Sequence, residues 1–135
     1  MTTDAVPHRR AASTWTVVRV LGALSLFAVG AIHLQQYLEL YSAIPTIGPL
    51  FLLNFVGATV VGLGLLASLE RLHALLAFAG AAQAATAFVF LYISERTPLF
   101  GFQEPGYDPA AILASRITEV ATVVLLGAWL VRRMR

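Results

Sequence analysis

The sequence predicts an all-α protein: a four-helix transmembrane bundle with up-down-up-down topology and with its N- and C-termini in the cytoplasm. Of the 135 residues, 59% are hydrophobic and only 12% are charged, whereas soluble domains carry about 25% charged residues. The apolar residues form four continuous runs, each of about 20 residues or more, which is the length that crosses about 30 Å of hydrocarbon. Continuous runs exclude barrel strands, in which apolar and polar residues alternate.

The expected elements follow one another with short connections. A flexible cytoplasmic segment over residues 1–14 precedes a four-helix membrane domain over residues 15–135, with helices over 15–40, 47–69, 72–93 and 110–131. Pro45 and Pro49 stand where the second helix begins, because proline is tolerated in a first turn and breaks a helix interior. The first run is too long for a cleaved signal peptide, so we expect it to be retained.

Arginines give the expected orientation. The chain has no lysine, and its arginines gather on one side of the expected helices: Arg9, Arg10, Arg19, Arg71, Arg132, Arg133 and Arg135. The opposite side carries Arg96 alone. Because positive residues stay in the cytoplasm, we expect a multi-pass protein of the bacterial cytoplasmic (inner) membrane.

Several chemistries are excluded by composition. The chain has no cysteine, which excludes disulfides, thiolate metal sites, thiol catalysis and covalent haem attachment. No histidine or carboxylate group has metal-ligand spacing, and only one histidine lies inside a run. We therefore predict no metal, no catalytic residue and no nucleic-acid partner. The expected partners are the lipid bilayer and, within it, a second copy or another membrane subunit.

Polar side chains interrupt the apolar runs. The set comprises His33, Gln36, Tyr37, Asn54, Gln83, Arg116 and Glu119. Lipid does not solvate such groups, so they should turn toward one another inside the bundle. Arg116 and Glu119 are spaced i, i+3 on one helix face, and we expect them to form an ion pair whose spare groups meet His33 and Asn54.

Two interpretations of this cluster stay open. In the first, it is a buried polar network that fixes helix register and binds nothing. In the second, it lines an outward-facing pocket for a small molecule, an ion or a proton, because ionisable groups within spans mark such sites. Glu39, Tyr41 and the loop over residues 94–109 would roof that pocket.

Three stretches carry a resemblance to known proteins. They are AIHLQQYL over residues 31–38, IPTIGPLFLLN over residues 44–54 and the loop LFGFQEPGY over residues 99–107. Together they resemble small four-helix bacterial membrane proteins and, more distantly, the DoxX-like proteins, some of which are linked to quinone-coupled electron transfer. The resemblance implies the bundle topology from Leu21 to Leu130. The residues themselves predict no cofactor, and a quinone enters only by analogy of fold. The resemblance supplies no catalytic motif.

The leading functional hypothesis is a non-enzymatic membrane component, either a small-molecule binder or an accessory subunit of a larger assembly. One alternative is a minimal homodimeric, proton-coupled transporter with Glu119 as its titrating group. Another is a redox-associated subunit that binds quinone near His33.

Overall fold

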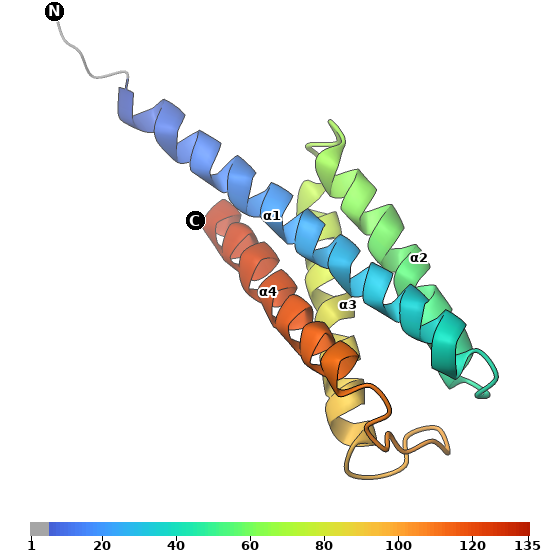
Figure 1. Cartoon of the computed structure of the whole chain (residues 1–135). Helices are drawn as coiled ribbons and strands as arrows, with labels where there is room; N and C mark the ends of the chain where they lie inside the picture. The colour runs from blue at the N-terminus through green and yellow to red at the C-terminus, as the bar shows by residue number, and fades with distance from the viewer. Residues whose placement is uncertain (1–5) are drawn as a thin grey trace, which may run out of the picture.

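The structure, a computed structural model, describes the backbone of residues 6–135 and the side chains of residues 14–135. Its elements are α1 (Val6–Gln36), a π-helical turn η1 (Tyr37–Tyr41), α2 (Ile47–Leu66), α3 (His73–Ser94) and α4 (Pro109–Met134) (Figure 1). The prediction of an all-helical chain is confirmed. Each of the four helices holds a stretch long and apolar enough to cross a membrane, which indicates a multi-pass membrane protein.

The helices differ from the predicted ranges at their ends. Part of the segment predicted to be flexible, residues 1–5, lies outside the described residues, and from Val6 onward the backbone is helical. Helix α2 ends at Leu66 because Ala67 adopts an extended backbone with φ −72° and ψ 161°. Helix α4 begins at Pro109, where the Asp108 carboxylate accepts a hydrogen bond of 3.0 Å from the Ala111 N–H, a preferred way to start a helix.

The first helix ends in a turn that the sequence did not predict. In η1 the Ser42 N–H donates to the Tyr37 carbonyl at 3.0 Å, an i→i+5 bond that places residues five apart on the same side. Gln36 and Tyr41 are such a pair, and both are buried. A regular α-helix, as predicted over residues 15–40, would turn Tyr41 away from Gln36.

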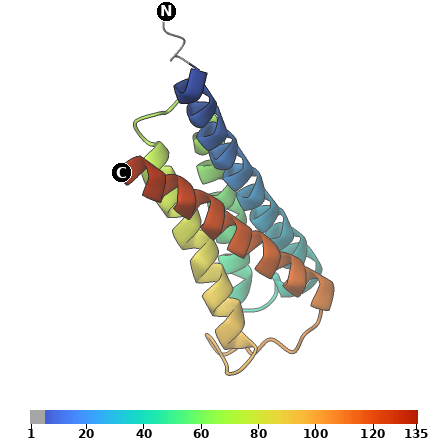
Figure 2. The same cartoon turned by 90° about the vertical axis from the view of Figure 1, so that its left-hand side faces the viewer.

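The helices approach one another at small residues. In a membrane no hydrophobic force drives helices together, so close backbone contact must hold them. A Cβ on Gly30 of α1 would lie 2.9 Å from the Ala58 Cβ of α2, and a Cβ on Gly22 would collide with the Leu126 side chain of α4. Helix α1 thus packs against both α2 and α4, and α3 packs beside α4 (Figures 1 and 2).

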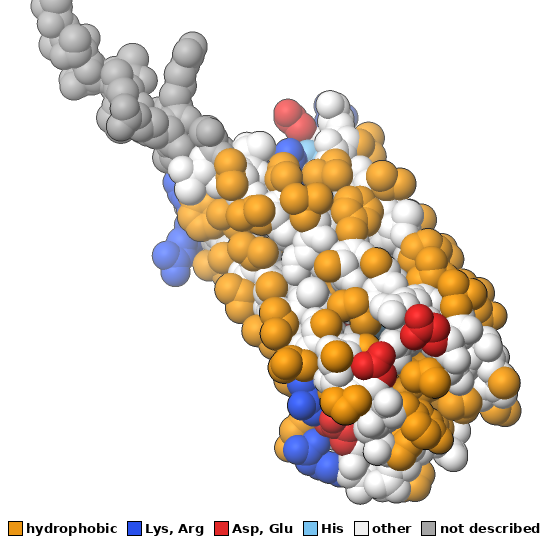
Figure 3. All heavy atoms as spheres, viewed as in Figure 1, with side chains coloured by type: hydrophobic (Ala, Val, Ile, Leu, Met, Phe, Trp, Pro, Cys, Tyr) orange, Lys and Arg blue, Asp and Glu red, His pale blue; other side chains and the backbone are white. Residues whose placement is uncertain are grey.

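The two ends of the bundle are built differently. One half holds the buried apolar cluster of Ala23, Leu65, Ala77, Leu126 and Trp129, and there Arg19 of α1 bonds His73 at the start of α3. At the other end η1 meets the connection after α3, because Tyr41 donates a hydrogen bond to Glu104. Figure 3 shows charged side chains mainly toward the two ends and hydrophobic ones between them, as membrane-spanning helices require.

Exchanging a contact glycine tests the packing of α1 on α2. We expect Gly30→Ala to be less stable than Gly127→Ala by about 1–3 kcal/mol, the range for overpacked sites. Both changes bring the same gain in helix propensity, about 1 kcal/mol, but a Cβ at Gly127 meets nothing within 4 Å. The free energy of unfolding in detergent measures the difference. Equal stability of the two variants would contradict a tight contact at Gly30.

Candidate functional site

A cavity of about 530 Å³ lies in the half of the bundle away from the buried apolar cluster. All four helices, η1 and the connection between α3 and α4 contribute to its wall. Most of the wall is apolar and includes the rings of Phe51, Phe90 and Phe102. The polar side chains in the wall, apart from Tyr41, are those of His33, Gln36, Asn54, Gln83, Thr86, Ser94, Glu104, Ser115 and Glu119.

The structure brings most of the predicted polar cluster to this cavity. Its wall includes His33, Gln36, Asn54, Gln83 and Glu119 from that set. Tyr37 and Arg116 are not among the lining residues. Tyr37 stands in the π-helical turn, which brings Tyr41 to the cavity instead.

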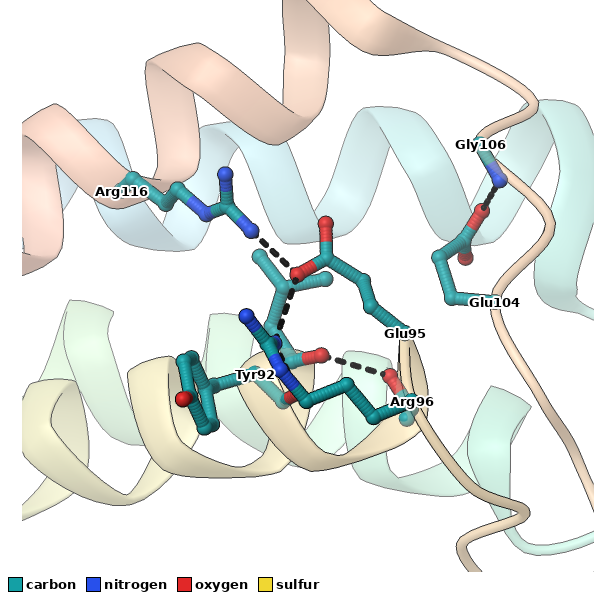
Figure 4. Close-up of polar contacts among 8 residues, drawn as sticks. Tyr92, Glu95, Arg96, Glu104, Gly106 and Arg116 are labelled. Atoms are coloured by element: carbon teal, nitrogen blue, oxygen red, sulfur yellow. Dashed lines mark hydrogen bonds and ion pairs between the residues drawn. The ribbon is translucent and has the colours of Figure 1, made fainter.

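The predicted ion pair between Arg116 and Glu119 is wrong. Arg116 instead bonds the carboxylate of Glu95 at the end of α3, and the Arg96 guanidinium lies 3.8 Å from the same oxygen (Figure 4). The Arg116 side chain is 39% exposed, because a long charged side chain turns its charged end toward the surface when it can reach it. Glu119 is left without the partner that its spacing suggested.

Glu119 is the polar group in the wall that the chain satisfies least. The residue is 1% exposed, and its Oε2 atom has no hydrogen-bond partner among the described residues. The large majority of buried polar atoms are bonded, and an unpaired one is a sign of strain or function. Glu119 thus adds to the cavity wall a buried acceptor atom that no described group of the chain fills.

The neighbouring polar side chains have partners inside the chain. His33 Nδ1 lies 2.8 Å from the Val29 carbonyl, to which only a protonated nitrogen can donate, and in the neutral ring Nε2 is then the acceptor. Gln83 Nε2 donates to the backbone and side-chain oxygens of Asn54 at 2.8 and 3.1 Å. These two hydrogen bonds link α3 to α2 beside the cavity.

The sequence prediction missed Glu104, which closes one end of the cavity. Tyr41 donates to its Oε2 at 2.5 Å, and its Oε1 accepts from the N–H groups of Gly106 and Tyr107 at 2.8 and 3.2 Å. Tyr41 also stacks on Phe51, with 4.6 Å between the ring centroids. The signal that could have found Glu104 is the Glu-Pro-Gly order of the loop, because a carboxylate before a turn can bond the turn's own N–H groups.

A second hydrogen bond stabilises this closed end of the cavity, which we call the roof. Gln36 Nε2 donates to Asp108 Oδ2 at 3.0 Å. The Ala111 N–H and then the Gln36 amide lower the pKa of Asp108 below its ordinary value, so the carboxylate is charged at neutral pH. The roof thus consists of Tyr41 and the loop, as expected, but Glu39 takes no part in it: that carboxylate accepts from Gln35 at 3.3 Å on the exposed surface.

The cavity reaches the apolar surface of the bundle between α2 and α3. Leu53 of α2 and both Ala82 and Thr86 of α3 line the cavity and are also exposed on the outside. These two helices pack less closely on each other than the other neighbouring pairs do. We call this gap the α2–α3 opening. In a bilayer it would face acyl chains rather than water.

The polar contact at the opposite end belongs to the closed half of the bundle. Arg19 bonds the His73 ring, and His73 Nε2 donates to the Ala67 carbonyl at 2.9 Å. His73 is 2% exposed, so this contact seals the connection between α2 and α3. Within the described part of the chain, no group of three or more histidine or carboxylate side chains could hold a metal ion.

Comparison with known proteins identifies no relative of this chain. No protein-family model matches the chain, and the curated proteins and the solved structures searched contain no match to it. The resemblance to the DoxX-like proteins stays a prediction. What the protein does is therefore inferred from the cavity and from the side chains in its wall.

Removing one hydroxyl tests the roof. We expect Tyr41→Phe to lower the free energy of unfolding by about 1–3 kcal/mol, because it leaves a buried carboxylate oxygen of Glu104 without a donor. Tyr107→Phe is the matched control, since Tyr107 is 62% exposed. Unfolding in detergent followed by circular dichroism measures both. A Tyr41→Phe variant as stable as the control would show that the bond does not hold the roof.

Proposed function

We propose that this protein is a non-enzymatic, multi-pass component of the bacterial inner membrane that binds an amphipathic small molecule between its helices. The observation that carries the proposal is a cavity of about 530 Å³ whose wall holds a buried carboxylate with an unfilled acceptor, Glu119 Oε2. Small-molecule sites have volumes of about 300–1,000 Å³ and mostly apolar walls with a few polar groups that fix orientation. The wall described above has this composition.

The α2–α3 opening supports a ligand that arrives from the lipid phase. At the other side the cavity is covered by the Tyr41–Glu104 and Gln36–Asp108 bonds. A molecule dissolved among acyl chains would meet the opening directly, with no polar barrier to cross. Its apolar part would lie near Leu53 and its polar part toward Glu119.

A purely structural network explains the cluster less well. Such a network stabilises a fold when every member is satisfied, and a partly satisfied one costs more than an apolar core would. Glu119 has a free acceptor, and the nearby Arg116 is engaged with Glu95. A binding role accounts for a carboxylate kept in this state.

The same carboxylate supports a second candidate, proton-coupled transport by a homodimer with Glu119 as the titrating group. The redox alternative has less support. A quinone presents carbonyl acceptors, whereas the His33 ring in its neutral form, with Nδ1 donating to the Val29 carbonyl, and Glu119 Oε2 are acceptors as well. Of the two, transport therefore has the better support.

For the membrane topology we propose an up-down-up-down course with both termini and the α2–α3 connection in the cytoplasm. The arginines support it: Arg71, Arg132, Arg133 and Arg135 belong to these cytoplasmic segments, and positive residues stay inside. The roof of the cavity would then face the outside of the cell.

Single cysteines test this orientation without background, because the chain has no cysteine of its own. We expect Gln103→Cys to react with a membrane-impermeant maleimide in intact spheroplasts. Ser68→Cys, in the α2–α3 connection, should react only after lysis. Both residues are exposed. The reverse labelling pattern would place the termini outside the cell.

Filling the cavity tests the binding proposal. Ala87 lines the cavity, whereas Ala128 is exposed on α4 outside it, so Ala87→Phe and Ala128→Phe are a matched pair. We expect mass spectrometry of organic extracts to find about one amphipathic molecule per chain in the parent and in Ala128→Phe. Because a phenylalanine would occupy the ligand's space, the amount should fall at least tenfold in Ala87→Phe. Identical extracts from both folded variants would mean that only surface lipid is carried along.

A further inference from the structure

We propose that the molecule bound in the cavity carries a positive charge, a protonated amine whose N–H group donates to Glu119 Oε2. This inference rests on the proposed function and adds the chemical class of the ligand. The observation behind it is the pairing of Arg116 with Glu95, which leaves the buried carboxylate of Glu119, in the cavity wall, without a hydrogen bond or ion pair from the arginine of its own helix.

The charges of the wall all have one sign. The lining residues include two carboxylates, Glu104 and Glu119, and no arginine, and the chain has no lysine. Glu104 already accepts from Tyr41, Gly106 and Tyr107, so the acceptor capacity left for a ligand lies at Glu119. An anionic head group would add a like charge next to a carboxylate, which is unfavourable at any low-dielectric site.

A neutral head group would serve this site less well than a cation. A buried carboxylate is expensive unless it is both hydrogen-bonded and paired with an opposite charge. A hydroxyl can supply the hydrogen bond alone, whereas an ammonium group supplies the bond and the charge. Charge-assisted bonds of this kind are about twice as strong as neutral ones.

The rest of the wall suits the tail of such a molecule. The rings of Phe51 and Phe90 line the cavity, and aromatic faces attract cations as well as alkyl chains. From Glu119 the tail can leave through the α2–α3 opening past Leu53. The geometry therefore points to a lipophilic amine with a single polar end.

Three probes with the same tail test the class: decylamine, decanol and decanoate, each below its micelle concentration. Binding is read as the rise in unfolding temperature of the purified protein, because a ligand of the folded state stabilises it by mass action. We expect decylamine to bind the parent at least tenfold more tightly than decanol, and decanoate to bind most weakly. In Glu119→Gln the preference for the amine should fall to within about twofold, with decanol binding retained. Glu39→Gln, an exposed carboxylate outside the wall, should keep the full preference.

The outcomes separate the two proposals. Equal binding of amine and alcohol by the parent, or an amine preference that survives Glu119→Gln, would overturn the cationic ligand while the binding function stands. If no probe binds and Ala87→Phe behaves as the parent, the binding function itself fails. Should Glu119→Gln not fold, the comparison of head groups on the parent, repeated on Ala87→Phe and Ala128→Phe, still decides the inference.

Discussion

Inside a membrane span a polar side chain must find its partner within the protein, because lipid offers no hydrogen bonds. Some of these side chains bond a carbonyl of their own helix, as His33 does, and others bond a neighbouring helix. Thr122 of α4 donates to Ser25 of α1 at 3.0 Å, and Gln83 of α3 donates to Asn54 of α2. Each such bond fixes how one helix sits beside the next, so the requirement that polar groups be satisfied sets much of the bundle's register.

The same requirement separates a closed half of the bundle from an open one. In the closed half, a Cβ on Gly80 would lie 2.9 Å from Leu126 and 3.0 Å from Leu26, so side chains pack closely against the α3 backbone there. In the open half all four helices surround the cavity, and its wall holds most of the predicted polar cluster. A packing defect would be expected to lack polar groups, since empty cavities are apolar. This coincidence of space and polarity argues for a site.

The sequence could predict the four helices, because run length and composition alone determine whether a segment can span a bilayer. It also predicted that His33, Asn54, Gln83 and Glu119 would share one interior. It could not predict the partner of Arg116, since the i, i+3 spacing measures closeness along one helix and not the competition from Glu95 on another. The π-helical turn could not be predicted for a related reason. It places Tyr41 against Glu104, and these residues lie 63 apart in the chain.

The hydrogen-bond donors within reach of each carboxylate explain why Glu119 differs from the other carboxylates near the cavity. Asp108 and Glu104 each accept backbone N–H groups of their own turn, and each also accepts a side-chain donor from the end of the first helix. These hydrogen bonds hold the roof of the cavity in place. Glu119 lies in mid-helix, where the backbone N–H groups are already bonded within the helix, so no local donor is available to it. In the function proposed here a ligand in the cavity supplies that donor, and the roof and the α2–α3 opening favour ligands that dissolve in the membrane.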